Sequence, residues 1–128
     1  MKRLLTTLML TLLSTGAMAE WTPVDKNDYM DVYVDFATIH KTGDIVKMWS
    51  LNNFKAAQTG TAGKYLSASS QDEYDCKKEQ NRLLAQSEYS GNMQGGIVIF
   101  ADSEPGGWKP VTLNSAREAL WKVACGKK

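Results

Sequence analysis

The chain has 128 residues, with 15 Lys and Arg against 14 Asp and Glu, and its length suits one globular domain. The near balance of charge argues against a nucleic-acid binder, because such a protein needs a basic surface to neutralise phosphates. After the first 19 residues, no segment is apolar enough to cross a membrane.

The N-terminus has the composition of a secretory signal peptide. Lys2 and Arg3 precede an apolar run from Leu4 to about residue 13, and Ala17 and Ala19 form an A-x-A cleavage pattern. The alternative is a membrane anchor, but this run is interrupted by threonines and is shorter than the ~20 residues that span a bilayer. We therefore predict a signal peptide over residues 1–19 and a single domain over residues 20–128.

Cleavage would leave 13 basic and 14 acidic residues, a net charge of −1. No cysteine lies at or near the cleavage point, so the sequence offers no lipobox for lipid attachment. We expect an exported protein without stable membrane insertion, located in the periplasm, at the cell surface or in the medium.

The two cysteines, Cys76 and Cys125, are predicted to form a disulfide, which is the default for a cysteine pair in an oxidising compartment. A metal site is not expected, because the sequence adds only His40 to these two distant thiols. A disulfide between residues 76 and 125 would close a loop of 49 residues, which removes unfolded-state entropy worth roughly 4 kcal/mol.

The first half of the domain predicts a β-hairpin. In residues 29–39, Met30, Val32, Val34 and Phe36 alternate with Tyr29, Asp31, Tyr33 and Asp35, which is typical of a half-buried antiparallel strand. A turn over residues 41–44 leads to a second run, residues 45–54, that is rich in β-branched and aromatic side chains.

The next segments are also predicted to be strands. Residues 59–64 form a polar loop, and residues 65–90 favour an exposed strand pair over a helix because of their tyrosines and serines. The charged residues 72–79 are interpreted as a solvated strand edge that blocks edge-to-edge pairing. Residues 97–102 are a compact apolar strand, between glycine pairs that are interpreted as turns or bulges.

The tail predicts the one helix. Ser115 and Glu118 have the spacing of a capping box, and Glu118 and Lys122 have the spacing of an i,i+4 ion pair. The expected buried stripe is Ala116, Ala119, Leu120 and Val123, with Trp121 and Cys125 in a flanking row. So wide an apolar arc predicts an α+β fold, in which a curved, mostly antiparallel sheet cradles this C-terminal helix and a disulfide tethers the helix to it.

Several short motifs, in order, resemble the surface-adhesin E (protein E) family of Gram-negative bacteria. They are Trp21, Y-x-D at 33–35, W-x-L-N at 49–52, E-Y-D-C at 73–76, E-Y-S at 88–90, W-K-P-V at 108–111 and A-L-W-K-V-A-C at 119–125. The resemblance covers essentially the whole domain, 20–128. It implies a curved antiparallel sheet with a disulfide-tethered helix, and a role in binding host matrix or plasma proteins.

The residues themselves do not indicate an enzyme or a cofactor. His40, the only histidine, ends a strand just before a turn, where a solvent-facing side chain is the usual outcome. Asp31 and Asp35 lie roughly 13 Å apart along an extended strand, which is wider than glycosidase acid/base pairs. The glycine pairs lack the strand-to-helix context of a phosphate loop.

Two interpretations of the aromatic residues stay open. The four tryptophans are expected to fill the core of this small domain. Alternatively, Tyr29 and Tyr33 form an exposed aromatic patch with Asp31 and Asp35 that recognises a protein partner.

We therefore predict an exported, non-enzymatic binding protein. The first hypothesis is an adhesin-like module that holds a protein ligand, and the second is a periplasmic envelope factor, such as an inhibitor or a chaperone-like partner of another envelope protein. The missing lipobox favours the second hypothesis, and the family resemblance favours the first. Fold alone does not separate them.

Overall fold

The computed structural model describes residues 19–127. The predicted signal peptide, residues 1–19, lies almost wholly outside this range. The chain order of the elements is β1 (Thr22–Lys26), β2 (Met30–Thr42), β3 (Ile45–Gly60), β4 (Gly63–Asp75), β5 (Gln80–Tyr89), the 3-10 helix η1 (Asn92–Gln94), β6 (Val98–Asp102), β7 (Lys109–Pro110) and α1 (Ala116–Ala124).

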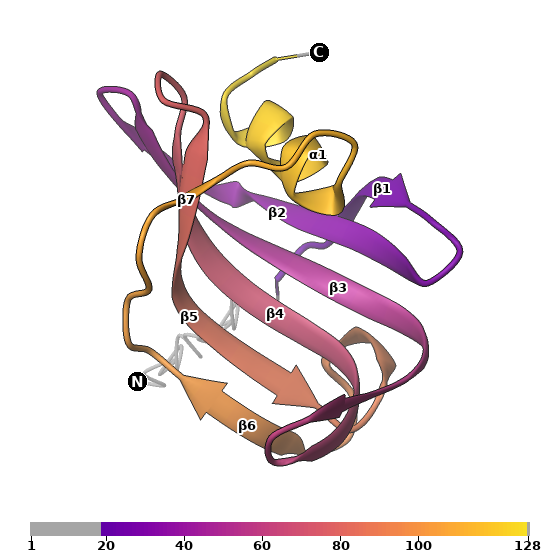
Figure 1. Cartoon of the computed structure of the whole chain (residues 1–128). Helices are drawn as coiled ribbons and strands as arrows, with labels where there is room; N and C mark the ends of the chain where they lie inside the picture. The colour runs from indigo at the N-terminus through magenta and orange to yellow at the C-terminus, as the bar shows by residue number, and fades with distance from the viewer. Residues whose placement is uncertain (1–18, 128) are drawn as a thin grey trace, which may run out of the picture.

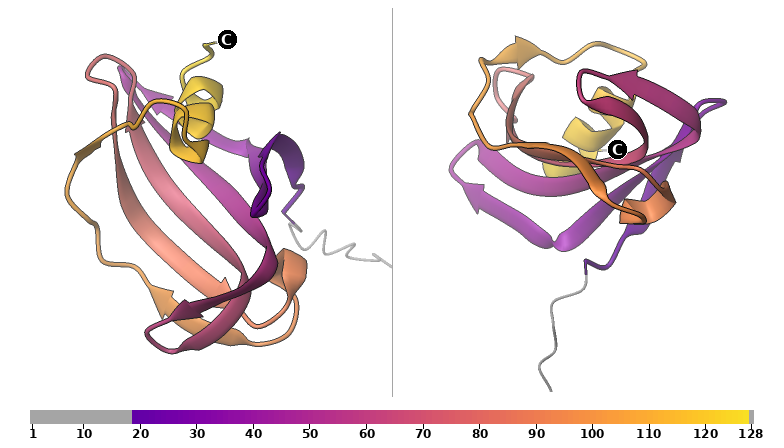
Figure 2. Two further views of the ribbon diagram at one scale, coloured as in Figure 1. Left: turned by 45° about the vertical axis from the view of Figure 1, so that its right-hand side comes forward. Right: turned by 90° about the horizontal axis from the view of Figure 1, so that it is seen from below.

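The strands form one antiparallel sheet in sequence order from β1 to β6, and the short β7 pairs with the start of β5. The sheet is strongly curved and stays open between its edge strands (Figure 1). Helix α1 lies inside the curve at one end, over β1 to β3, as the view from below in Figure 2 shows. The predicted α+β fold is confirmed.

The predicted hairpin is formed by β2 and β3, whose register pairs Val32 with Asn52 and Val34 with Ser50. Gly43 adopts the left-handed backbone, φ 61°, that the tight turn between the two strands requires. The predicted 59–64 loop is shorter than expected, because β3 continues to Gly60 and β4 begins at Gly63.

The expected alternation in β2 ends at Asp35. Val32 and Val34 are fully buried, but Phe36 is 49% exposed and Asp35 is only 8% exposed. The pairing of β2 with β3 shifts between Asp35 and His40, and such an irregularity re-aims the side chains beyond it. The assignment of Phe36 to the buried face and of Asp35 to the solvent face was therefore wrong.

The main core lies between the concave face of the sheet and α1. Buried side chains from β2, β3 and β4 meet the helix there: Val32, Val34, Val46, Met48, Tyr74, Leu120, Trp121 and Ala124. The hydroxyl of Ser115 accepts a hydrogen bond from the amide of Glu118 at 3.2 Å, which confirms the predicted helix cap. The predicted pair of Glu118 and Lys122 is also present, at 3.2 Å.

The buried stripe of α1 differs from the predicted one. Leu120, Trp121 and Ala124 are the buried residues of the helix, while Ala116 and Val123 are only partly buried. Trp121, which was expected in the flanking row, faces the sheet beside Leu120, and its indole Nε1 donates a hydrogen bond to the carbonyl oxygen of Asp75, 2.9 Å away.

The predicted disulfide between Cys76 and Cys125 is present, with Cα atoms 5.6 Å apart. Cys76 directly follows β4, and Cys125 is the C-cap of α1. The bond therefore fixes the last turn of the helix to the end of a central strand.

The tryptophans do not share one role. Trp121 is in the core, whereas Trp108 is 38% exposed and Trp21 and Trp49 are half-buried. Trp21 Nε1 donates to Gln94 Oε1 at 2.9 Å, so this indole contacts η1 rather than the core under α1. The expectation that all four fill the core was wrong.

The charged segment 72–79 is not a sheet edge. Strand β4 is central, hydrogen-bonded to β3 on one side and to β5 on the other. Asp72 is 7% exposed, and Glu73 accepts two hydrogen bonds from Arg82, at 2.6 and 2.9 Å. Only the turn residues 77–79 are solvated as expected.

Candidate functional site

The four residues predicted to form a binding patch are only partly brought together. Tyr29 lies in the turn before β2 and is 76% exposed. Asp31 and Tyr33 line a shallow hollow of about 570 Å³ together with β1. Asp35 is buried, and its Oδ1 accepts from the amide of Ala37 at 3.2 Å. We call Tyr29, Asp31 and Tyr33 the Tyr29 surface.

The turn that carries Tyr29 is held by a local hydrogen-bond network. Asn27 Oδ1 accepts from the amides of Tyr29 and Met30, at 2.8 and 3.0 Å. Lys55 of β3 ties the turn to the sheet, because its amide donates to the carbonyl of Tyr29 at 2.9 Å and its Nζ to that of Asn27 at 2.9 Å. The exposed ring is therefore presented from a fixed backbone.

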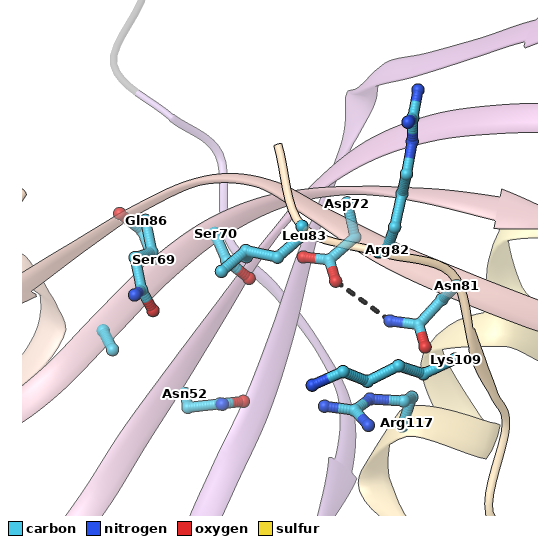
Figure 3. A pocket seen from close by; sticks show the side chains of 13 residues that line it. Asn52, Ser69, Ser70, Asp72, Asn81, Arg82, Leu83, Gln86, Lys109 and Arg117 are labelled. Carbon is cyan, nitrogen blue, oxygen red and sulfur yellow. Dashed lines mark hydrogen bonds between the residues drawn. The ribbon is translucent and has the colours of Figure 1, made fainter. Parts of the chain in front are cut away.

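A second site lies on the concave face below α1 and was missed from the sequence. It is a pocket of about 340 Å³ between the sheet, the segment that leads to β7 and the start of the helix. In Figure 3, Asp72 and Asn81 point toward each other, and Lys109 and Arg117 extend side by side toward Asn52. We call these residues the polar pocket: Asn52, Asp72, Asn81, Lys109 and Arg117.

The floor of the polar pocket has buried acceptor oxygens without protein donors. Asn81 Nδ2 donates to Asp72 Oδ2 at 3.0 Å, and this bond sets the orientation of both side chains. Asp72 Oδ1, Asn81 Oδ1 and Asn52 Oδ1 are buried and have no donor from residues 19–127. Asp72 is 7% and Asn81 is 4% exposed. Burying an acceptor unpaired costs stability, so such oxygens call for a partner.

The floor of the polar pocket carries a carboxyl group, whereas its rim carries two cations. Burial raises the pKa of the Asp72 carboxyl above its usual value, and the nearby Ser70 hydroxyl, the Asn81 amide and the charge of Arg117 counteract this only in part. Lys109 and Arg117 are exposed at the rim. In the described part of the chain, the ion pairs are Arg82 with Glu73 and Lys122 with Glu118, so neither rim cation is neutralised by one.

The polar pocket could not be found by motif because its five residues come from five different elements, β3, β4, β5, β7 and α1. One signal was available: Ser70, Asp72 and Tyr74 share a face by strand alternation, so a buried Tyr74 implies that Asp72 points inward too. Using that signal required knowing that β4 is central rather than at the edge.

Other classes of site receive no support from the geometry. His40 is exposed near the end of β2. Residues 19–127 contain no group of three or more His, Cys, Asp or Glu side chains that could hold a metal ion. No helix in that range is long and apolar enough to span a membrane.

Similarity to solved structures agrees with the fold. No curated protein sequence matches the chain. A crystal structure of protein E from non-typeable Haemophilus influenzae is similar, with a TM-score of 0.60 and 13% identity over 88% of this chain and 79% of that one. A second crystal form of Haemophilus influenzae protein E gives a TM-score of 0.59 and 12% identity, over 86% of this chain and 97% of that one.

At such low identity, these structures support the fold alone, and family membership comes from the sequence. The family model described as surface-adhesin protein E matches residues 21–126, which is nearly the whole domain. That range includes both cysteines, all four tryptophans, the Tyr29 surface and the polar pocket. The chain therefore belongs to the surface-adhesin protein E family.

Proposed function

We propose that this protein is an exported, non-enzymatic adhesin-like module that binds a host matrix or plasma protein through the Tyr29 surface. Family membership supports an adhesin-like role. The observation that carries the proposal is the 76% exposure of Tyr29 on a turn fixed by Asn27 and Lys55.

An exposed tyrosine on a rigid turn suits protein recognition. Aromatic side chains are enriched in the cores of protein interfaces, and Tyr combines a large contact area with few rotatable bonds. Fixing the turn in advance lowers the entropy lost on binding. Asp25, Asp31 and Lys26 line the adjoining hollow, and its excess of carboxylates favours a ligand segment that carries basic residues.

Binding is tested with immobilised matrix and plasma proteins and the purified mature domain. We expect at least one ligand to bind, and Tyr29→Ser combined with Tyr33→Ser to weaken it at least about tenfold. Phe36→Ser is the matched control, because Phe36 is an exposed aromatic residue on the same strand outside the Tyr29 surface. Full binding by the double variant, with its melting temperature unchanged, would reject the Tyr29 surface.

Display on the cell is tested separately by protease shaving of intact cells that express a tagged copy. Loss of the tag from intact cells supports the adhesin-like role. Protection until the outer membrane is permeabilised would contradict it and favour a partner in the periplasm, to be sought by crosslinking.

A further inference from the structure

We propose that the polar pocket binds a small zwitterion of the amino-acid class, whose ammonium meets the oxygens of Asn52, Asp72 and Asn81 and whose carboxylate meets Lys109 and Arg117. This site is on the concave face, whereas the Tyr29 surface is formed by β2 and the turn before it, so the two proposals stand independently.

The floor selects a hydrogen-bond donor. Asn52 Oδ1, Asp72 Oδ1 and Asn81 Oδ1 accept no hydrogen bond from residues 19–127. Asp72 and Asn81 both line the pocket, and their mutual 3.0 Å bond holds the two side chains in place. A ligand ammonium carries three donors and a positive charge, which matches three acceptors of which one is a carboxylate.

The rim selects an anionic group on the same molecule. Lys109 and Arg117 lie around the opening and are not used by the ion pairs of the described chain. A simple amine would leave these cations without a counterion and would be repelled by them. A simple carboxylate would leave the floor oxygens without donors.

The size of the site fits a small ligand. The volume of about 340 Å³ is at the lower end of the range for small-molecule sites, roughly 300–1,000 Å³. An adjoining hollow of about 350 Å³ shares Asn52, Asp72, Asn81 and Arg117 and reaches under α1 to Leu120. That space can take a side chain attached to the zwitterion.

The test is a titration of the mature domain, labelled with nitrogen-15, with the twenty common amino acids, β-alanine and 4-aminobutyrate, each to about 10 mM, a concentration that reveals millimolar affinity. We expect one or more of these probes to shift the side-chain amide signals of Asn52 and Asn81. Ethylamine, acetate and glucose are the comparison probes, and each should bind at least about tenfold more weakly because it lacks one charge or both.

Matched variants separate the pocket from its surroundings. Asp72→Asn and Arg117→Gln should each weaken the best probe at least about tenfold, since each removes a charge-assisted hydrogen bond. Glu118→Gln and Lys122→Gln are the controls, with an expected change of less than about twofold, because neither side chain lines the pocket and each is paired with the other on α1.

Three results would overturn the proposal. The first is that no amino-acid probe shifts the Asn52 and Asn81 signals. The second is that ethylamine, acetate or glucose binds as well as the best amino acid. The third is that Asp72→Asn retains full affinity. None of these results bears on binding through the Tyr29 surface.

Discussion

Trp121 Nε1 donates a hydrogen bond to the carbonyl oxygen of Asp75, 2.9 Å away, at the residue directly before the disulfide cysteine Cys76. A covalent bond and a hydrogen bond therefore join the same turn of α1 to the same end of β4. The indole ring is buried in the core, and its N–H donates to the backbone carbonyl of the last residue of β4.

Replacing Trp121 with Phe should lower the free energy of unfolding by about 1–3 kcal/mol, because the ring stays apolar but the carbonyl of Asp75 loses its donor. Urea unfolding monitored by circular dichroism measures the loss. Trp108→Phe is the control, since Trp108 is 38% exposed and should change stability by less than about 0.5 kcal/mol. Equal losses in the two variants would show that the bond to Asp75 contributes nothing.

Removing the disulfide with Cys76→Ser and Cys125→Ser together should lower the free energy of unfolding by about 2–5 kcal/mol, mainly because the 49-residue loop regains its freedom in the unfolded state. The thiol reductant dithiothreitol should destabilise the wild type by a similar amount and leave the double variant unchanged. A double variant as stable as the wild type would contradict this account.

Ser115→Ala should cost about 1 kcal/mol, because the hydroxyl of Ser115 accepts from the amide of Glu118 in the first turn of α1. Ser115→Asp should retain most of the stability, since a carboxylate oxygen can accept the same bond. Ser103→Ala, in the exposed segment after β6, should have no effect. Thermal unfolding of the three variants decides whether the cap contributes.

The sequence alone predicted those features that depend on neighbouring residues. The alternation before Asp35 and the turn at Gly43 identified the β2–β3 hairpin, and the Ser115 and Glu118 spacing identified the start of α1. Phe36 was misplaced because the pairing of β2 shifts after Asp35, which strand periodicity does not reveal.

The polar pocket depends on strand order and register, which no local pattern encodes. Asp72 and Asn81 are diagonal neighbours on the adjacent strands β4 and β5, because Asp72 pairs with Leu83 and Tyr74 pairs with Asn81. The register shift between Gln71 and Asp72 leaves Leu84 of β5 as an extra residue, so it changes which side chains of β5 face the pocket. The rim cations Lys109 and Arg117 belong to β7 and α1, which lie far along the chain from β4.

Asp72→Asn should stabilise the protein at neutral pH. Burial raises the pKa of this carboxyl in the folded state above its usual value. The group's contribution to stability is therefore fully present below the unfolded pKa and is lost as the pH rises through the folded pKa. Asparagine stays neutral and can still accept the bond from Asn81 Nδ2, so the variant escapes this loss.

The measurement is urea unfolding of the wild type and Asp72→Asn between about pH 3 and 7, in the absence of any ligand. The two proteins should have nearly the same stability at the acidic end. As the pH rises, Asp72→Asn should become more stable than the wild type. Glu73→Gln, which breaks the ion pair with Arg82 on the opposite face, should give no such gain. A less stable Asp72→Asn at pH 7 would mean that the carboxylate is already compensated within the chain, and it would remove the physical reason for a ligand ammonium at this site.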